Sequence, residues 1–422
     1  MSQFAGENCP DGTSVPSPHH TNQVIYVPPT HSFKSLDNLT KHGQRSSVVH
    51  SLIQSCGLES SCILEPLRIA TVSEALLAHS RHYLSVLRAS SLYHYPGVAN
   101  YTPYSDLDII DFRDDEERKL HLEDAGLIDD CPTFNGVWEL AMLTVGGAVV
   151  ASQQLIARRA NVACWFDGGR HHARFDMAHG FCYLNDVVVA CKILLSEPGI
   201  RRVLYIDIDV HHGDGVEESF LYNPDVTTVS FHLAQKGFYP GTGHTITPRE
   251  TPPNYSVFRV PLRRGIGDDA FISIFRNMMN LVMNHHRPDV LVLQCGCDGV
   301  YGDPLGDFNL SGKAYTSCVS YLLDYNIPLL ILGGGGYDTA NAARVWADVL
   351  QTCIRHVSIR KGNQAVSMSI NRDVPLHDDF FDLYGPDFTR DIPTGSIPDE
   401  NTSESLQHIV DEVKTVLNVI PQ

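Results

Sequence analysis

Residues 203–215 read VLYIDIDVHHGDG, and this stretch joins an apolar run to a dense cluster of charged side chains. Its last nine residues hold three carboxylates and two imidazoles, which no hydrophobic core requires. In an extended strand, residues two apart point to the same face, so Asp209 and His211 are expected to converge on one ion. A solvated acidic loop is the alternative, but the cluster continues directly from the apolar run and closes with two glycines, which suit a tight turn. The stretch therefore predicts a divalent metal at the carboxyl end of a buried strand, where α/β proteins place their ligands.

Apolar runs and helical patterns alternate along most of the chain. Short apolar, β-branched runs are expected to form strands at 24–27, 162–166, 203–208, 226–231, 290–293 and 328–332. Helical spacing is found at 138–159, 184–196, 270–285 and 340–354. The alternation predicts an α/β fold in which helices cover both faces of a mainly parallel sheet. Because no internal repeat or Pro- or Ser-rich linker interrupts it, residues 23–416 are expected to form one domain after a disordered tail at residues 1–22.

Composition and charge narrow the class of function. The chain has 422 residues, and 43% of them are hydrophobic, which is enough for a sizeable core. The formal charge of -18 argues against binding to a nucleic-acid backbone and favours a cationic substrate, such as a basic peptide or a polyamine. We identify no apolar run near the roughly 18 residues that span a bilayer, and we expect a soluble intracellular protein without membrane contact. The eleven Cys residues form no CxxC pair, as is typical of reduced thiols.

The segment from 101 to 128 is much more acidic than its surroundings. Such a run of Asp and Glu is typical of a solvated surface loop. We therefore expect an acidic loop insertion in the domain at this position.

Four further motifs have the character of a buried site. They are GGRHHA at 168–173, GFCYLND at 180–186, QCGCD at 294–298 and LGGGGYD at 332–338. The first, third and fourth follow predicted strands, so their side chains are expected at the same edge of the sheet. The four glycines are not read as a phosphate-binding loop, because the Lys and Ser or Thr that should follow are absent. They instead indicate a backbone that approaches the site closely and presents Tyr337 to it.

The third motif completes a metal site. Asp298 provides a third ligand beside Asp209 and His211, which leaves a position open for water, as in catalytic rather than structural zinc sites. Such an ion acidifies water and polarises a substrate carbonyl.

The two histidines of the first motif are candidates for proton transfer. A neutral imidazole at His171 or His172 takes a proton during attack and later returns one to the leaving amine. Asp207 and Asp214 are the carboxylates expected to orient these rings. Tyr337 is expected to donate a hydrogen bond to the developing oxyanion. Together these groups predict the hydrolysis of an amide.

In their order and residues, these motifs resemble those of the zinc-dependent class I histone deacetylases, which have the arginase-deacetylase fold. The similarity runs from about residue 24 to about residue 414 and implies a sheet of about eight strands. It implies Zn2+ on Asp209, His211 and Asp298, although this ligand set also accepts Fe2+. It also implies that His172, oriented by Asp214, is the general base and acid, that His171, oriented by Asp207, assists electrostatically, and that Tyr337 stabilises the tetrahedral intermediate.

The resemblance also implies a substrate channel and a second ion. Gly180, Phe181 and Tyr239 would wall the channel around a lysine side chain, Leu305 would form its rim, and Asp130 would bind the substrate backbone. Arg45 and Arg170 would lie at the foot of the pocket. Structural K+ would bind at Asp207, Asp209, His211, Ser230 and Phe231. The implied substrate is acetyl-lysine in basic segments such as histone tails. The resemblance also implies that the protein acts in a corepressor-type complex in the nucleus and/or cytoplasm.

The chain departs from the family pattern at three places. Arg170 stands where the family usually has an aromatic residue, which predicts a more polar, more positive foot pocket and an altered acyl preference. Tyr239 replaces a Phe and adds a hydroxyl at the channel wall, and the insertion at 101–128 is long. The alternatives are an acetylpolyamine deacetylase, a bimetallic ureohydrolase, whose extra bridging carboxylates are not evident, and a non-catalytic acetyl-lysine binding scaffold.

Overall fold

The computed structural model describes residues 23–29, 36–37, 43–92, 107–108, 110, 112–247, 257–360 and 371–419. Within these residues, one eight-stranded sheet has the order β2-β1-β3-β8-β7-β4-β5-β6, and every neighbouring pair is parallel. The strands are β1 (Val24–Tyr26), β2 (Cys62–Leu64), β3 (Val162–Trp165), β4 (Val203–Asp207), β5 (Val226–Leu233), β6 (Val257–Leu262), β7 (Val290–Gln294) and β8 (Leu329–Leu332). The expected α/β fold with a parallel sheet is confirmed.

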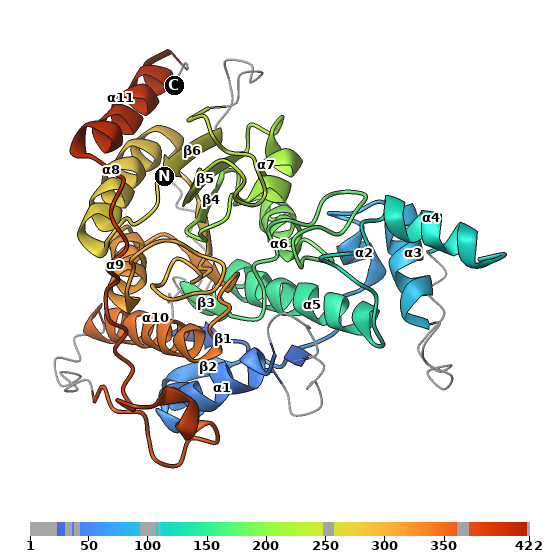
Figure 1. The fold of residues 1–422 in the computed structure, drawn as a ribbon, viewed down its shortest axis with the longest axis horizontal. Helices are drawn as coiled ribbons and strands as arrows, with labels where there is room; N and C mark the ends of the chain where they lie inside the picture. Colours follow the sequence, from blue (N-terminus) through green and yellow to red (C-terminus); the bar gives the residue numbers. More distant parts are fainter. Residues whose placement is uncertain are drawn as a thin grey trace, which may run out of the picture.

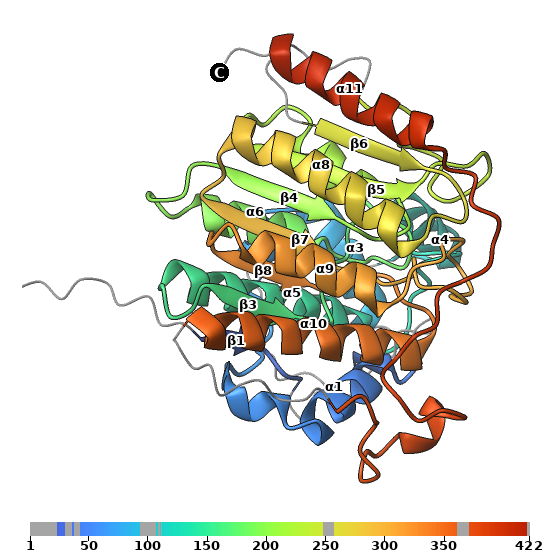
Figure 2. The same cartoon turned by 90° about the vertical axis from the view of Figure 1, so that its left-hand side faces the viewer.

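Helices cover both faces of this sheet (Figures 1 and 2). One face packs against α1 (Arg45–Ser55), α8 (Asp268–His286), α9 (Gly312–Leu323), α10 (Thr339–Arg360) and α11 (Ser403–Val419). The other packs against α2 (Val72–Ala75), α3 (Arg81–Leu92), α5 (Val137–Ile156), α6 (Asp186–Leu195) and α7 (Asp214–Phe220). Short 3-10 turns lie at Leu58–Ser61 and Phe381–Tyr384. Figure 2 shows α8, α9 and α10 side by side across the first face.

Side chains along the strands alternate between the two faces of the sheet, which divides the core into two clusters. Leu204 and Ile206 of β4 point into the cluster under the first set of helices, and Val203 and Tyr205 point into the cluster under the second. Successive side chains of a strand point to opposite faces, so a strand buried on both sides reads as a continuous apolar run. This is why the interior strands were predictable from the sequence.

Helix α5 corrects one expectation. Its 20 residues include an 18-residue window with a mean hydropathy of 1.3, so it is long and apolar enough to cross a membrane, and the expectation that the chain holds no such run is wrong. In the structure 78% of this window is buried inside the protein. Core helices pass the same test of length and composition, because a helix buried all round is apolar all round.

The acidic segment also differs from its prediction. Of the residues from 107 to 128 that the structure describes, Asp115–Asp124 form a helix, α4, rather than a loop. Asp114 caps its start by accepting a hydrogen bond from the Glu117 amide at 2.8 Å, and three carboxylates in its first turn suit the positive end of the helix dipole. None of its residues is buried, so it lies on the surface as expected. The predicted tail at residues 1–22 lies outside the described residues.

The central strands place the motifs. β3, β8, β7 and β4 are neighbours in the sheet, and the motifs at 168–173, 332–338, 294–298 and 207–215 lie at or follow their carboxyl ends. Segments far apart in the sequence therefore meet at one edge of the sheet.

Candidate active site

The three predicted metal ligands meet at the ends of β4 and β7. Asp209, His211 and Asp298 are buried, and each offers a ligand atom within 4.8 Å of the others. His211 Nδ1 lies 3.1 Å from an oxygen of Asp209 and 2.9 Å from an oxygen of Asp298. This is a set of one nitrogen and two oxygen ligands around a common point.

Electrostatics show that this cluster fits a cation. Burial disfavours the charged imidazole of His211, but the carboxylates of Asp298 and Asp209 outweigh it and raise the pKa of His211 to about 10. Burial and the neighbouring Asp209 raise the pKa of Asp298 to about 7. A positive charge among these residues therefore stabilises the buried carboxylates. Two carboxylates and one imidazole form a donor set that suits a catalytic zinc ion.

Backbone and amide groups hold these ligands in place. Gln294 Nε2 and the Gly335 amide each donate to Asp209 Oδ2 at 2.8 Å, and the Val210 amide donates to Asp298 Oδ1 at 2.8 Å. A Cβ added at Gly335 would lie 2.0 Å from Asp298 Oδ2. The glycine run is therefore required for close approach, as the sequence indicated, whereas the role of Gln294 was not anticipated.

The two predicted histidine–aspartate pairs are formed beside this cluster. His171 Nδ1 lies 2.8 Å from Asp207 Oδ2, and His172 Nδ1 lies 2.7 Å from Asp214 Oδ1. Burial disfavours the charged form of His171, but Asp207 and Asp209 outweigh it and raise its pKa to about 9. Burial and the adjacent His171 lower the pKa of His172 to about 3. The pair therefore divides into a charged and a neutral imidazole, as an acid–base site needs.

Tyr337 completes the arrangement. Its ring centroid lies 6.4 Å from that of His211, and its backbone amide donates to Asp303 Oδ2 at 2.7 Å. Burial and the nearby Asp298 raise the pKa of Tyr337 well above its ordinary value, so the phenol keeps its proton. Asp303, which holds the Tyr337 backbone, was not identified from the sequence.

A cavity of about 380 Å³ opens onto these groups. Its lining contains all the predicted wall and rim residues together with three of the predicted metal-binding and catalytic residues: Asp130, Gly180, Phe181, Tyr239, Leu305, His172, His211 and Tyr337. Asp130 is exposed, and Leu305 is 39% exposed, as expected at a channel mouth. Phe238, which the sequence analysis did not assign, also lines the cavity and stacks on His211 with ring centroids 5.1 Å apart.

The Tyr239 hydroxyl has a partner in the wall. Its oxygen lies 2.6 Å from Nδ1 of His179, and its ring packs edge-on against His172 with centroids 5.0 Å apart. Gly180 leaves the space for this contact, because a Cβ there would lie 2.6 Å from both His172 and the Tyr239 oxygen. His179 was missed because an isolated His in a loop gives no sequence signal.

Neither predicted foot-pocket arginine lines the cavity, but Arg170 lines a smaller pocket that shares Phe181 with it. Arg45 Nη1 donates to the Gly336 carbonyl at 2.9 Å, and Arg170 Nη2 donates to the Asp167 carbonyl at 3.0 Å. Burial and the charge of Arg170 lower the pKa of Arg45 to about 10. Asp167 offsets part of this positive charge and pairs with His50 at 2.8 Å.

The five predicted potassium ligands lie at the end of β4 and in the neighbouring part of β5. Asp207 of β4 is in register with Ser230 of β5, and Asp209 and His211 follow β4. The Phe231 side chain is buried in the core, so only its carbonyl could bind an ion. Potassium at this position stays a prediction.

Known proteins match most of this chain. The family model described as the histone deacetylase domain matches residues 39–353. Histone deacetylase 8 of Danio rerio is 32% identical over 394 residues, which cover 93% of this chain and 95% of that protein. Histone deacetylase 1 of Homo sapiens is 36% identical over 377 residues, which cover 89% of this chain and 71% of that protein. The parallel sheet and its covering helices agree with the arginase-deacetylase fold, and the chain belongs to the histone deacetylase family.

Proposed function

We propose that this protein is a zinc-dependent lysine deacetylase that hydrolyses the acetamide of N-ε-acetyl-lysine in basic protein segments such as histone tails. One observation carries this proposal: the cluster of candidate metal ligands and the two histidine–aspartate pairs meet at the end of one channel. In these pairs the imidazole of His171 is charged and that of His172 is neutral. The histone deacetylase relatives support the same reaction class.

The ligands Asp209, His211 and Asp298 would hold the ion. Zn2+, or Fe2+ on the same ligands, would supply Lewis-acid chemistry by polarising the amide carbonyl and lowering the pKa of water. The neighbouring residues perform the proton transfers and orient the substrate.

His172 is the proposed general base. Its Nδ1 proton is held by Asp214, so Nε2 carries the free lone pair and accepts a proton from the attacking water. The same Nε2 proton then passes to the leaving lysine amine. His171 remains charged beside it and stabilises negative charge in the transition state.

Tyr337 is the proposed oxyanion donor. Because its phenol keeps its proton in the buried site, it donates a hydrogen bond to the carbonyl oxygen as negative charge develops there.

The channel selects the substrate. Phe181 and Tyr239 both line the cavity, and we propose that their rings flank the lysine methylenes, while Asp130 at its mouth contacts the peptide backbone. The chain charge of -18 favours cationic peptides. Arg170 beside Arg45 makes the foot of the pocket positive, and we propose that it restricts the length of the acyl group.

Ion binding and cellular context complete the proposal. Potassium on Asp207, Asp209, His211, Ser230 and Phe231 would link the end of β4 to the neighbouring part of β5. As a histone deacetylase relative, the protein is proposed to act in the nucleus and/or cytoplasm, in a corepressor-type complex.

The ligand assignment is tested with Asp209→Ala. Removing one ligand leaves the site incomplete, so this variant should lose its tightly bound zinc and its activity together. The matched control is Asp269→Ala, whose side chain is 93% exposed on the surface and which should keep both. Metal analysis and turnover of an acetyl-lysine peptide are measured on the same samples; full zinc content in Asp209→Ala would refute the assignment.

A further inference from the structure

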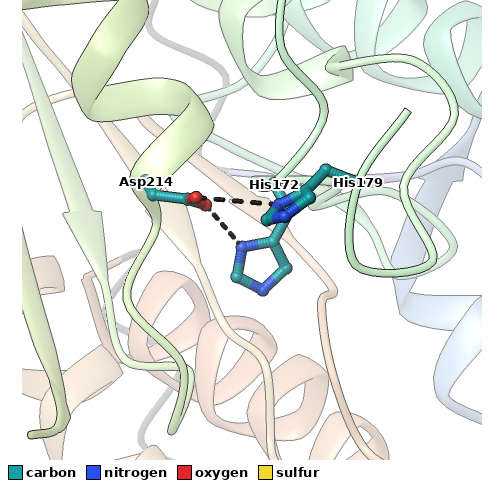
Figure 3. Close-up of side chains that lie close together, drawn as sticks. All are labelled: His172, His179 and Asp214. Atoms are coloured by element: carbon teal, nitrogen blue, oxygen red, sulfur yellow. Dashed lines mark hydrogen bonds and ion pairs between the residues drawn. The ribbon is translucent and has the colours of Figure 1, made fainter. Parts of the chain in front are cut away.

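A second group of potential metal ligands lies beside the channel. His172, His179 and Asp214 each offer a ligand atom within 4.8 Å of the others. Figure 3 shows both imidazoles turned toward the Asp214 carboxylate, at 2.7 Å for His172 Nδ1 and 3.7 Å for His179 Nδ1. The proposed acid–base pair needs only one of these imidazoles. The second has no part in the proposed reaction.

We propose that His172, His179 and Asp214 form a second, inhibitory site for zinc or a similar divalent transition metal. Two imidazole nitrogens and a carboxylate oxygen are ligands that zinc prefers, and three protein ligands suffice when water fills the fourth position. The site itself is independent of the proposed function, whereas its inhibitory effect rests on the proposed role of His172.

The protonation states favour binding. Burial lowers the pKa of His179, and burial together with His171 lowers that of His172 to about 3, so both rings are neutral near pH 7. Burial disfavours the Asp214 carboxylate, but its hydrogen bonds with His172 and Arg174 outweigh this and lower its pKa far below the usual range. Metal binding therefore releases no net proton from the ligands. His172 loses the proton on Nδ1 and takes up one on Nε2.

That change of tautomer explains the inhibition. An ion on Nδ1 leaves the Nε2 of His172 protonated, and a protonated Nε2 cannot accept a proton from water. The His179 side chain is 29% exposed, so an ion can reach this site from solvent.

Two neighbours keep this site weaker than the catalytic one. Arg174 Nη2 lies 2.9 Å from Asp214 Oδ2, and its charge repels a cation. Its Nη1 is 3.5 Å from Glu218, toward which the guanidinium can move. The Tyr239 hydroxyl, which is hydrogen-bonded to His179 Nδ1, must also move away before an ion can bind this nitrogen.

The test is zinc titration of metal-stripped protein, by calorimetry and by competition with a chromophoric chelator. Wild type should bind two zinc ions per chain, one tightly and one more weakly. His179→Gln should weaken the second site at least tenfold. Arg174→Gln should tighten it about tenfold, because a repelling charge is removed. Misfolding cannot mimic this gain of affinity.

The activity measurement tests the inhibitory effect. Turnover of an acetyl-lysine peptide should rise with the first equivalent of zinc and fall with excess zinc. The fall should disappear in His179→Gln and persist in the control His408→Gln, whose side chain is 76% exposed on α11.

A single zinc ion per chain in wild type would overturn the proposal, as would a second zinc bound equally by wild type and His179→Gln. If no peptide is hydrolysed under any condition, the proposed deacetylase activity fails, while the count of zinc ions still decides whether the second site exists.

Discussion

His171 and His172 show how neighbouring identical residues acquire different chemistry. Both are buried and each is paired with an aspartate, but Asp209, 3.9 Å from Nε2 of His171, adds negative charge there, while burial and the charge of His171 lower the pKa of His172. The sequence predicted both pairs because each residue stands in a motif at or after a strand end. It did not predict Gln294, Asp303, Phe238 or His179, because their roles depend on contacts with residues that are distant in sequence.

The substitution Tyr337→Phe should lower kcat about 10²- to 10³-fold, because it removes a hydrogen-bond donor to the developing oxyanion. KM and zinc content should change little, since the ring and the metal ligands remain. Steady-state kinetics and metal analysis of the same preparation check this result. A rate within threefold of wild type would show that the phenol does not stabilise the transition state.

Among the elements, six of the eight described strands were predictable. β6 was missed because Arg259 and Pro261 interrupt its pattern; both are tolerated because β6 is the edge strand. β2, at the opposite edge, was missed because its three side chains are only partly buried, so no buried apolar run marks it. α4 was missed because charged residues on all sides give no apolar stripe.

Helix α5 provides a test of element packing. A Cβ at Gly146 would lie 1.8 Å from the Arg68 carbonyl oxygen, and backbone atoms cannot yield as a flexible side chain does. Gly146→Ala should therefore destabilise the protein by about 2–3 kcal/mol or more, although the same change in an exposed helix stabilises by about 1 kcal/mol.

Urea unfolding measures this effect. The matched control is Gly199→Ala, because the nearest atom to a Cβ there is 3.9 Å away. Equal stability of Gly146→Ala and wild type would show that α5 does not approach the backbone so closely.

For the whole molecule, buried neutral histidines make stability depend on pH. His79 is 1% exposed and its Nε2 accepts a hydrogen bond from the Asn185 amide at 2.8 Å, which requires an unprotonated nitrogen. Burial lowers the pKa of His79 from 6.5 to about 4. Between these values the unfolded chain binds a proton that the folded protein does not, so acidification favours unfolding.

The free energy of unfolding should therefore fall as pH decreases from 6.5 to 4, with His79 contributing up to about 1.4 kcal/mol per pH unit. His79→Gln should reduce this slope by up to about 1.4 kcal/mol per pH unit, which corresponds to one proton. The exposed control His408→Gln should leave the slope almost unchanged. Urea unfolding at several pH values compares the three proteins. An unchanged slope in His79→Gln would mean that folding does not shift the pKa of His79.

We propose that the site at the ends of β4 and β7 hydrolyses acetyl-lysine only when it holds its metal. The most direct measurement is acetate release from an acetyl-lysine peptide by metal-stripped protein, before and after one equivalent of zinc, with longer acyl-lysines and acetylated spermidine as comparators. We predict no turnover without metal and restored turnover of the acetyl peptide with zinc. Equal rates with and without metal, or no turnover by the fully metallated protein, would show that this site is not a metal-dependent lysine deacetylase.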